Sequence, residues 1–349
     1  MHDFPRLRPA APAAFLSLSA AATAVPVPPQ TTASGYAFAF PSSGPRLEIE
    51  PAIGARFTSL KLGTAEFLFV DRAGLNWGAT FWPSPQNTWG WPPSEALDRA
   101  PYTGGPAGNS LVLASAKDNS TQLSFAKRIS AEDADTSFRL AFSVRNGSGA
   151  ARMNTPWLVT RVLPGGLTFF AKGPGRGDLA SQVKEVSGWL WFDYDAAVIP
   201  GGSPKYYGDG AGWMAHVDRN GILLLEVFPD IAASQAAPEE AEVEIYTDPA
   251  KKYMEIEHQG AYASIPPGDS AVWTTRWFLR KLPAGAEKKA GDPKLMALVS
   301  ELLTRASTGL ASTPAAPRPM GKRSRRSIRL FQAEAPGSRP IDARGRANP

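Results

Sequence analysis

The sequence predicts an all-β fold: a large antiparallel two-sheet β-sandwich followed by a short C-terminal helix. Three observations support this class. Between about residues 45 and 282 the apolar side chains recur mostly at every second position, which is the period of a strand. Turn-forming residues separate these runs at hairpin spacing. A helical period recurs clearly only near residue 300. Many strands with few helices indicate antiparallel packing of two sheets.

Twelve segments are predicted to be strands because each is short, rich in β-branched or aromatic residues, or alternates apolar with polar side chains. In order they are 47–50, 57–62, 66–70, 111–115, 121–129, 137–144, 157–163, 188–194, 221–228, 243–246, 253–258 and 272–280. The turn sequences KDNS, RNGSG, DRNG and PPGDS lie between strands. Twelve strands exceed an immunoglobulin-like domain, so a large sandwich of two sheets is expected over residues 45–286.

The helix is predicted over residues 290–308. Asp292 is a suitable N-cap, and Pro293 fits the first helical position, where its missing N–H costs nothing. The apolar residues of this segment recur at helical spacing and form one stripe: Leu295, Leu298, Val299 and Leu302. That stripe should dock on the sandwich.

The two ends of the chain differ from its body. Residues 1–24 have the pattern of a secretory signal peptide: Arg6 and Arg8, an apolar run, then a small-x-small site. The alternative is a disordered Ala/Pro leader. A Pro/Ala-rich linker is expected over 25–44, and a disordered basic tail over 313–349. A periplasmic or secreted location follows from the signal peptide, with no membrane insertion of the mature chain.

The net charge of +5 does not indicate a nucleic-acid-binding protein. The positive charge is concentrated in the C-terminal tail, and the predicted sandwich is mildly acidic. The tail sequence GKRSRRSIR could contact nucleic acid or anionic lipid, but a solvated tail is the simpler interpretation. The chain has no cysteine, which excludes disulfides, thiolate catalysis and cysteine-based metal sites.

The segment GLNWGATFWPSPQNTWGWPP (74–93) contains four of the ten tryptophans. Proline and glycine interrupt it too often for a regular element, so we expect a recognition loop. Indole faces cover the apolar C–H faces of sugars, and amide side chains satisfy their hydroxyls. The candidate ligand-binding residues are Asn76, Trp77, Trp82, Gln86, Trp89 and Trp91. About half of these indoles could instead fill the end of the core, with Trp89 and Trp91 the more exposed; Trp273 and Trp277 are expected in the core.

Three segments carry a resemblance to a known family. IGARFTSLKLGTAEFLFV (53–70) resembles the opening hairpin of galactose mutarotase-like (aldose 1-epimerase-like) proteins. FRLAFSVRNGSGAARMNTPWLVTRV (138–162) resembles their middle strands, and MEIEHQGAYASIPPGDSAVWTTRWFL (254–279) resembles their closing segment. The nearest resemblance is to an uncharacterised branch with the tryptophan-rich segment. It implies a β-supersandwich that binds carbohydrate on a concave sheet face.

The resemblance also implies a mechanism in which a glutamate base and a histidine acid open the sugar ring. Glu257 in EHQ matches the family's Glu-x-Gln pattern and is the candidate base. The acid has no clear counterpart, because Thr155-Pro156-Trp157 stands where the family places a histidine. His258 follows Glu257 on a strand and should point to the opposite face. His216 is left as a weak candidate acid.

Simpler explanations exist for several of these residues. Glu257 shares an alternating polar face with its strand neighbours, and such a face is often merely solvated. Arg161 and Arg276 lie in apolar strands, where each needs a carboxylate partner. An acidic sugar would make them ligand-binding residues, but a buried ion pair with a glutamate such as Glu257 is the simpler explanation. Asp193, Asp195 and Asp209 suggest calcium but lack regular ligand spacing, so no metal and no cofactor is predicted.

The functional expectation is carbohydrate binding by a mutarotase-like domain, with a saccharide or glycan as partner. One alternative is an aldose 1-epimerase-like isomerase that uses Glu257 as base. Another is a structural module associated with an envelope polysaccharide, which an open groove rather than a closed pocket would favour.

Overall fold

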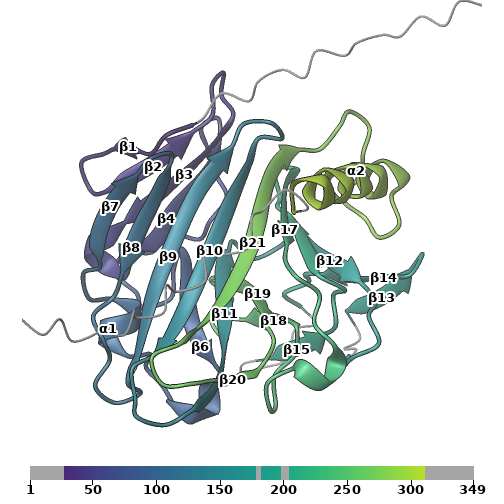
Figure 1. The fold of residues 1–349 in the computed structure, drawn as a ribbon. Coiled ribbons are helices and arrows are strands. Elements are labelled where there is room, and N and C mark those ends of the chain that lie inside the picture. Colours follow the sequence, from purple (N-terminus) through teal and green to yellow (C-terminus); the bar gives the residue numbers. More distant parts are fainter. Residues whose placement is uncertain (1–26, 178–181, 198–203, 311–349) are drawn as a thin grey trace, which may run out of the picture. The chain divides into compact units, whose positions relative to one another are not determined.

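The computed structural model describes residues 27–177, 182–197 and 204–310. Within them the chain forms two large antiparallel sheets and two α-helices, so the predicted all-β sandwich is confirmed (Figure 1). The predicted signal peptide and basic tail lie outside the described residues. No described helix has the length and apolar character needed to cross a membrane.

The larger sheet has eleven strands among the described residues. In spatial order its main path is β1 (Gln30–Thr31), β2 (Tyr36–Ala39), β3 (Pro45–Glu50), β4 (Arg56–Leu62), β6 (Ala79–Ser84), β11 (Arg152–Val162), β19 (Met254–Gln259), β18 (Val243–Thr247) and β15 (Lys205–Gly208). Two short strands lie off this path: β5 (Ala65–Glu66) pairs with β4, and β20 (Ala263–Ile265) pairs with β11.

The second sheet has ten strands among the described residues. Their spatial order is β13 (Val183–Val186), β14 (Trp189–Asp193), β12 (Leu167–Ala171), β16 (Trp213–Val217), β17 (Ile222–Val227), β21 (Ser270–Lys281), β10 (Ser137–Asn146), β9 (Leu123–Glu132), β8 (Ser110–Ala114) and β7 (Thr103–Ala107). The helices are α1 (Glu95–Asp98) and α2 (Pro293–Leu310).

The main core lies between the sheets. Phe57 on β4 contacts Phe142 on β10 and Trp277 on β21, with ring centroids 6.1 Å and 5.5 Å apart. Phe81 on β6 stacks on Phe142 at 4.5 Å. Trp273 also belongs to this core, so the prediction that Trp273 and Trp277 are core residues is confirmed. Burial of such large aromatic rings stabilises the sandwich.

Helix α2 covers part of the outer face of the second sheet, beside β17 (Figure 1). Its stripe packs on residues of that face, with Leu295, Val299 and Leu302 buried and Leu298 half-buried. Oδ1 of Asp292 accepts hydrogen bonds from the backbone N–H groups of residues 294 and 295, at 3.1 and 2.9 Å. The predicted cap and docking face are therefore confirmed.

The structure corrects two boundaries. Residues 25–44 are not only a linker, because β1 and β2 extend the larger sheet and the side chain of Phe38 is fully buried. The predicted strand 66–70 is reduced to β5 and an isolated bridge between Leu68 and Val162. Burial of Phe38 in the core favours a strand here more than the surrounding turn-forming residues disfavour it.

A third correction concerns the tryptophan-rich segment, part of which is a regular strand. β6 lies between β4 and β11, and all six of its residues are buried. Gly78, with φ +63°, lets the chain enter this strand close to β4, since a Cβ there would lie 2.3 Å from the Phe57 carbonyl oxygen. Pro83 is tolerated because β4 pairs with β6 only at Phe57 and Ala79, so no N–H is needed on that side.

Candidate functional site

A cavity of about 540 Å³ opens on the face of the larger sheet that points away from the main core. Strands β6, β11, β19, β18 and β15 supply its floor, and the loop after β6 supplies one wall. Its lining is mainly aromatic, carboxylate and amide: Asn76, Trp82, Gln86, Trp91, Trp157, Lys205, Tyr207, Tyr246, Asp248, Tyr253, Glu255 and Glu257. Aromatic surface with a few convergent polar groups is typical of a small-molecule site.

Strand alternation brings these side chains to one face. On β19, Glu255 and Glu257 line the cavity, whereas Ile256 packs in the core between the sheets. His258 also points into that interior, where its ring stacks on Phe228 at 4.1 Å. The prediction that His258 and Glu257 lie on opposite faces is confirmed. The solvated-face interpretation of Glu257 is wrong, because its side chain is fully buried.

Cross-strand register groups the carboxylates around one lysine. Glu257 on β19 lies directly opposite Glu244 on β18, and Lys205 comes from β15 beyond them. The Lys205 ammonium forms an ion pair with Glu244 and lies 3.3 Å from Oε2 of Glu257 and 3.8 Å from Oε2 of Glu240. It also lies 4.6 Å from the ring centroid of Trp157. One cation therefore holds three carboxylates that would otherwise repel one another.

Burial and mutual repulsion shift the titration of this cluster. Burial raises the pKa of Glu257 to about 7, although Lys205 opposes the shift. Burial also raises the pKa of Glu244 well above its ordinary value. Burial lowers the pKa of Lys205, but the surrounding glutamates outweigh this effect and raise it well above 10.5. Burial therefore favours the protonated form of these carboxyl groups, and the glutamates favour the charged form of the lysine.

Glu257 has one anchored and one unpartnered oxygen. Its Oε2 accepts a 2.8 Å hydrogen bond from the indole N–H of Trp157. Its Oε1 is buried and finds no hydrogen-bond partner among the described residues. A buried acceptor without a partner is costly, so this oxygen is suited to receive a donor from a ligand.

A second layer of hydrogen bonds fixes the floor of the cavity. Gln259 donates to Oε1 of Glu244 at 2.8 Å and accepts from the hydroxyl of Ser84. Arg161 donates from Nε to Oε1 of Glu255 at 2.7 Å and from Nη1 to the Thr80 hydroxyl at 3.0 Å. These contacts orient the two cavity-lining strands, β18 and β19, against β6 and β11.

Trp82 is the centre of the indole cluster. Its ring makes edge contacts with Trp89, Trp91 and Trp157, with centroids 5.9, 5.8 and 5.4 Å apart. Its indole N–H donates to Oδ1 of Asp98 at 2.7 Å, and the other oxygen of Asp98 pairs with Arg56 at 3.0 Å. The ring orientation is thus fixed by residues that do not line the cavity.

The structure brings together half of the ten residues that the sequence predicts for a ligand site. Asn76, Trp82, Gln86, Trp91 and Glu257 all line the cavity. Their roles in binding or catalysis stay predictions.

The predicted residues of the cavity wall differ in how they are held. Trp91 is 52% exposed, as expected for a contact residue. Asn76 donates to the Tyr253 hydroxyl at 2.8 Å, and the backbone N–H of Gln86 donates to Oε1 of Glu240 at 3.1 Å. These bonds connect the tryptophan-rich segment to the strands that carry the carboxylates.

Two predicted tryptophans do not line this cavity. Trp77 is buried, and the guanidinium groups of Arg56 and Arg72 lie about 5 Å from its ring centroid. Trp89 is half-buried, donates to the Pro83 carbonyl at 2.8 Å and lines a separate hollow of about 460 Å³. The expectation that Trp89 and Trp91 are the more exposed of the four tryptophans is confirmed, but the ring of Trp89 packs against Trp82 outside this cavity.

The two arginines and His216 also require correction as site residues. Arg161 is fully buried beneath the cavity and pairs with Glu255, so it does not meet a ligand directly. Arg276 lies in the second sheet and pairs with Asp135. Burial lowers the pKa of His216 to about 3, and its Nδ1 lies 2.8 Å from the Thr168 hydroxyl in the interior. A histidine that is neutral and distant from the cavity cannot supply the acid proton.

Sequence reasoning missed several lining residues. Trp157 belongs to the segment Thr155-Pro156-Trp157, which stands where the resembled family places a histidine. Tyr246, Tyr253 and Glu255 share a predicted strand face with other polar residues. No sequence pattern pointed to Lys205, because it begins a strand that was not predicted. It lies near Glu257 only because β15, β18 and β19 are neighbours in the sheet.

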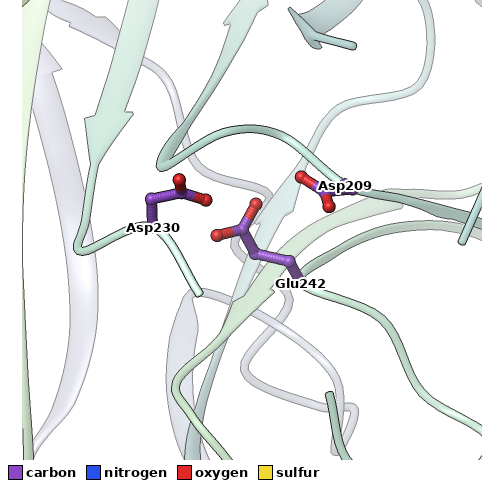
Figure 2. Close-up of side chains that lie close together, drawn as sticks. All are labelled: Asp209, Asp230 and Glu242. Atoms are coloured by element: carbon purple, nitrogen blue, oxygen red, sulfur yellow. The ribbon is translucent and has the colours of Figure 1, made fainter. Parts of the chain in front are cut away.

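A second acidic cluster lies outside the cavity (Figure 2). One carboxylate oxygen each of Asp209, Asp230 and Glu242 lie within 4.8 Å of one another. Glu242 already accepts backbone N–H bonds from Gly210 and Ile231, at 2.8 and 3.0 Å, and burial raises its pKa to about 7. Glu242 therefore anchors the loops before β16 and β18, and Asp209 is joined here by Asp230 and Glu242 rather than by Asp193 or Asp195.

Comparisons with known proteins identify the fold. A galactose mutarotase-like protein from Lactobacillus casei is similar, with 11% identity, a TM-score of 0.50, and coverage of 70% of this chain and 100% of that chain. The Slr1438 protein from Synechocystis shows 13% identity, a TM-score of 0.48, and coverage of 73% and 98%. A galactose mutarotase-like protein from Clostridium acetobutylicum shows 12% identity, a TM-score of 0.46, and coverage of 72% and 98%.

Comparison of the sequence, in contrast to comparison of the structure, gives no match. No protein-family model matches it, and no curated protein matches it. The structural likeness extends over the whole length of the Lactobacillus casei protein. The chain has the galactose mutarotase-like fold.

Proposed function

We propose that this chain, with its galactose mutarotase-like fold, binds a saccharide in the cavity formed by Trp91, Trp157 and Glu257. A single observation carries the proposal: the tryptophan-rich segment and the strand glutamate, far apart in sequence, line the same cavity. Such a combination of flat apolar rings and hydrogen-bonding groups matches the two kinds of surface that a sugar presents.

In this proposal each kind of lining group contacts a different part of the sugar. The exposed indole of Trp91 offers a platform for the C–H face of a pyranose. Oε1 of Glu257 and the carboxylate of Asp248 offer acceptors for hydroxyl groups, and Asn76 and Gln86 offer amides. Acidic groups outnumber the one lysine of the lining, which favours neutral over acidic sugars.

A second candidate function is epimerisation at the anomeric carbon, and the titration of Glu257 favours it. A carboxylate with a pKa of about 7 can accept the proton of the anomeric hydroxyl at neutral pH. The ring oxygen must receive a proton as the C–O bond breaks. An indole is not an acid, so Trp157 cannot replace the family's histidine. Lys205 and the tyrosine hydroxyls are the remaining proton donors of the lining.

The binding proposal is tested by titrating a panel of neutral monosaccharides and following tryptophan fluorescence and calorimetric heat. Trp91→Ala and Glu257→Gln should each weaken binding, whereas Leu163→Ala, at an exposed position outside the cavity, should not. If no sugar in the panel binds, the proposal fails. Anomer exchange, followed by NMR with the same variants, separates a binding protein from an epimerase.

We also propose that the mature protein acts outside the cytoplasm, in the periplasm or as a secreted protein. Arg6 and Arg8, the following apolar run and the small-x-small site support this proposal. Mass spectrometry of the protein from its native host should find an N-terminus near residue 25. An intact Met1 in the purified protein would contradict it.

A further inference from the structure

The cavity is the middle of three connected hollows. A hollow of about 370 Å³ shares Gln86, Trp91, Lys205 and Tyr207 with it. Another of about 370 Å³ shares Asn76, Trp91, Asp248 and Tyr253 with it. Because each outer hollow shares four lining residues with the cavity, the three form one continuous groove.

Trp91 is the residue common to all three hollows. Its side chain is half exposed, and its ring touches the cluster through an edge contact with Trp82. The two outer hollows share no other lining residue, so they lead away from Trp91 along two different groups of side chains. An exposed ring at the centre of a groove can contact successive units of one extended ligand.

The outer hollows continue the polar chemistry of the cavity. The hollow beyond Gln86 is lined by Asn87, Glu239 and Glu240 in addition to the shared residues. The hollow beyond Tyr253 is lined by Asp71 and Lys252, together with Phe69 and Leu75. Acidic side chains outnumber lysines along the whole groove, which disfavours a polyanionic ligand.

We infer that the groove binds an uncharged glycan chain of at least three sugar units, with the middle unit in the cavity and its neighbours in the two outer hollows. This inference rests on the proposed saccharide-binding function and specifies its ligand class. It also accounts for the two hollows that adjoin the cavity, because the middle unit of a glycan chain is linked to two neighbours.

The test uses three ladders of neutral oligosaccharides, each from one to six units: β-1,4-linked glucose, β-1,4-linked N-acetylglucosamine and α-1,4-linked glucose. Calorimetry on the whole chain measures affinity against length. In at least one ladder, affinity should rise about three- to tenfold for each newly occupied hollow and reach a plateau once the groove is filled.

Variants locate the chain within the groove. Asn87→Ala lies in one outer hollow and Lys252→Ala in the other, and both side chains are exposed, so folding should tolerate the changes. Each should reduce the gain in affinity from one to three units, and the double variant should reduce it further. Leu163→Ala, outside the groove, should leave the gain unchanged.

The outcomes separate this inference from the proposal beneath it. If a monosaccharide binds and no ladder gains affinity with length, the extended groove is rejected and saccharide binding stands. If affinity rises with length but neither outer variant alters the gain, the assignment of the hollows is wrong. If neither monosaccharides nor oligosaccharides bind, both the inference and the proposed function fail.

Discussion

The indole N–H of Trp157 donates a 2.8 Å hydrogen bond to Oε2 of Glu257, a residue 100 positions later in the chain. Both side chains are buried, and they lie on the adjacent strands β11 and β19. The bond stabilises the ionised form of the glutamate and leaves its other oxygen without a partner. The ionisation of Glu257 therefore depends on an aromatic residue of the Thr155-Pro156-Trp157 segment.

Removing that donor should raise the pKa of Glu257 above about 7. Trp157→Phe keeps a ring in place and deletes the N–H, so the carboxylate loses a hydrogen bond and its neutral form is favoured. The free energy of unfolding at pH 8 should fall by about 1–3 kcal/mol. Infrared titration of the carboxyl stretch, compared with that of Glu257→Gln, measures the shift. An unchanged titration would show that the indole does not control this group.

Stability should fall as pH rises from about 4.5 to about 7. A carboxyl whose folded pKa is raised binds its proton more tightly in the folded state, so its stabilising contribution is present at low pH and lost through this window. Glu257→Gln should flatten the dependence, as measured by urea unfolding at each pH. Glu242→Gln should flatten the stability profile in the same way, because burial raises the pKa of Glu242 to about 7 as well, but it should leave sugar affinity unchanged.

Lys205→Met should destabilise the protein more strongly at high pH than at low pH. The substitution leaves Glu244 and Glu257 buried opposite each other without a cation. Loss of one partner from such a cluster costs about 3 kcal/mol when the remaining carboxylates are ionised. The double variant Lys205→Met with Glu257→Gln should recover part of the loss. If the double variant is no more stable than the single one, the proposed repulsion is not the cause.

Uronic acids should bind at least about tenfold more weakly than the corresponding neutral sugars, because the cavity is acidic. The two arginines that the sequence offered as partners for an acidic sugar are already paired, Arg161 with Glu255 and Arg276 with Asp135. Paired calorimetric titrations with glucose and glucuronate, and with galactose and galacturonate, provide the measurement. Tighter binding of the uronates would refute this electrostatic argument.

Arg276→Met should affect stability without affecting ligand binding. Arg276 pairs with Asp135 and donates to the Ser137 hydroxyl at 2.8 Å in the second sheet, so its loss leaves a half-buried carboxylate without its partner. The expected loss is about 3 kcal/mol of unfolding free energy, measured by urea denaturation. Sugar affinity at a temperature where the variant is folded should equal that of the unsubstituted chain. A selective loss of affinity would return Arg276 to the binding site.

The sequence by itself determined the class of fold, the positions of most strands, and which residues of β19 share a face. These features are local, because strand period and helix capping depend on neighbours a few positions apart. Alternation alone was enough to separate Glu257 from His258. Sequence also identified Trp82, Trp91 and Gln86 as members of one candidate site through their unusual local composition.

Only the tertiary structure decided which groups meet Glu257. Lys205, Trp157 and Glu244 reach it because β15, β18, β19 and β11 are neighbours in the sheet, an order that no local pattern encodes. The same applies to β6. Its residues form a strand because they are buried between β4 and β11, although glycine and proline interrupt the surrounding sequence. The pKa of Glu257 follows from that burial and from cross-strand register, and both exist only once the two sheets have formed.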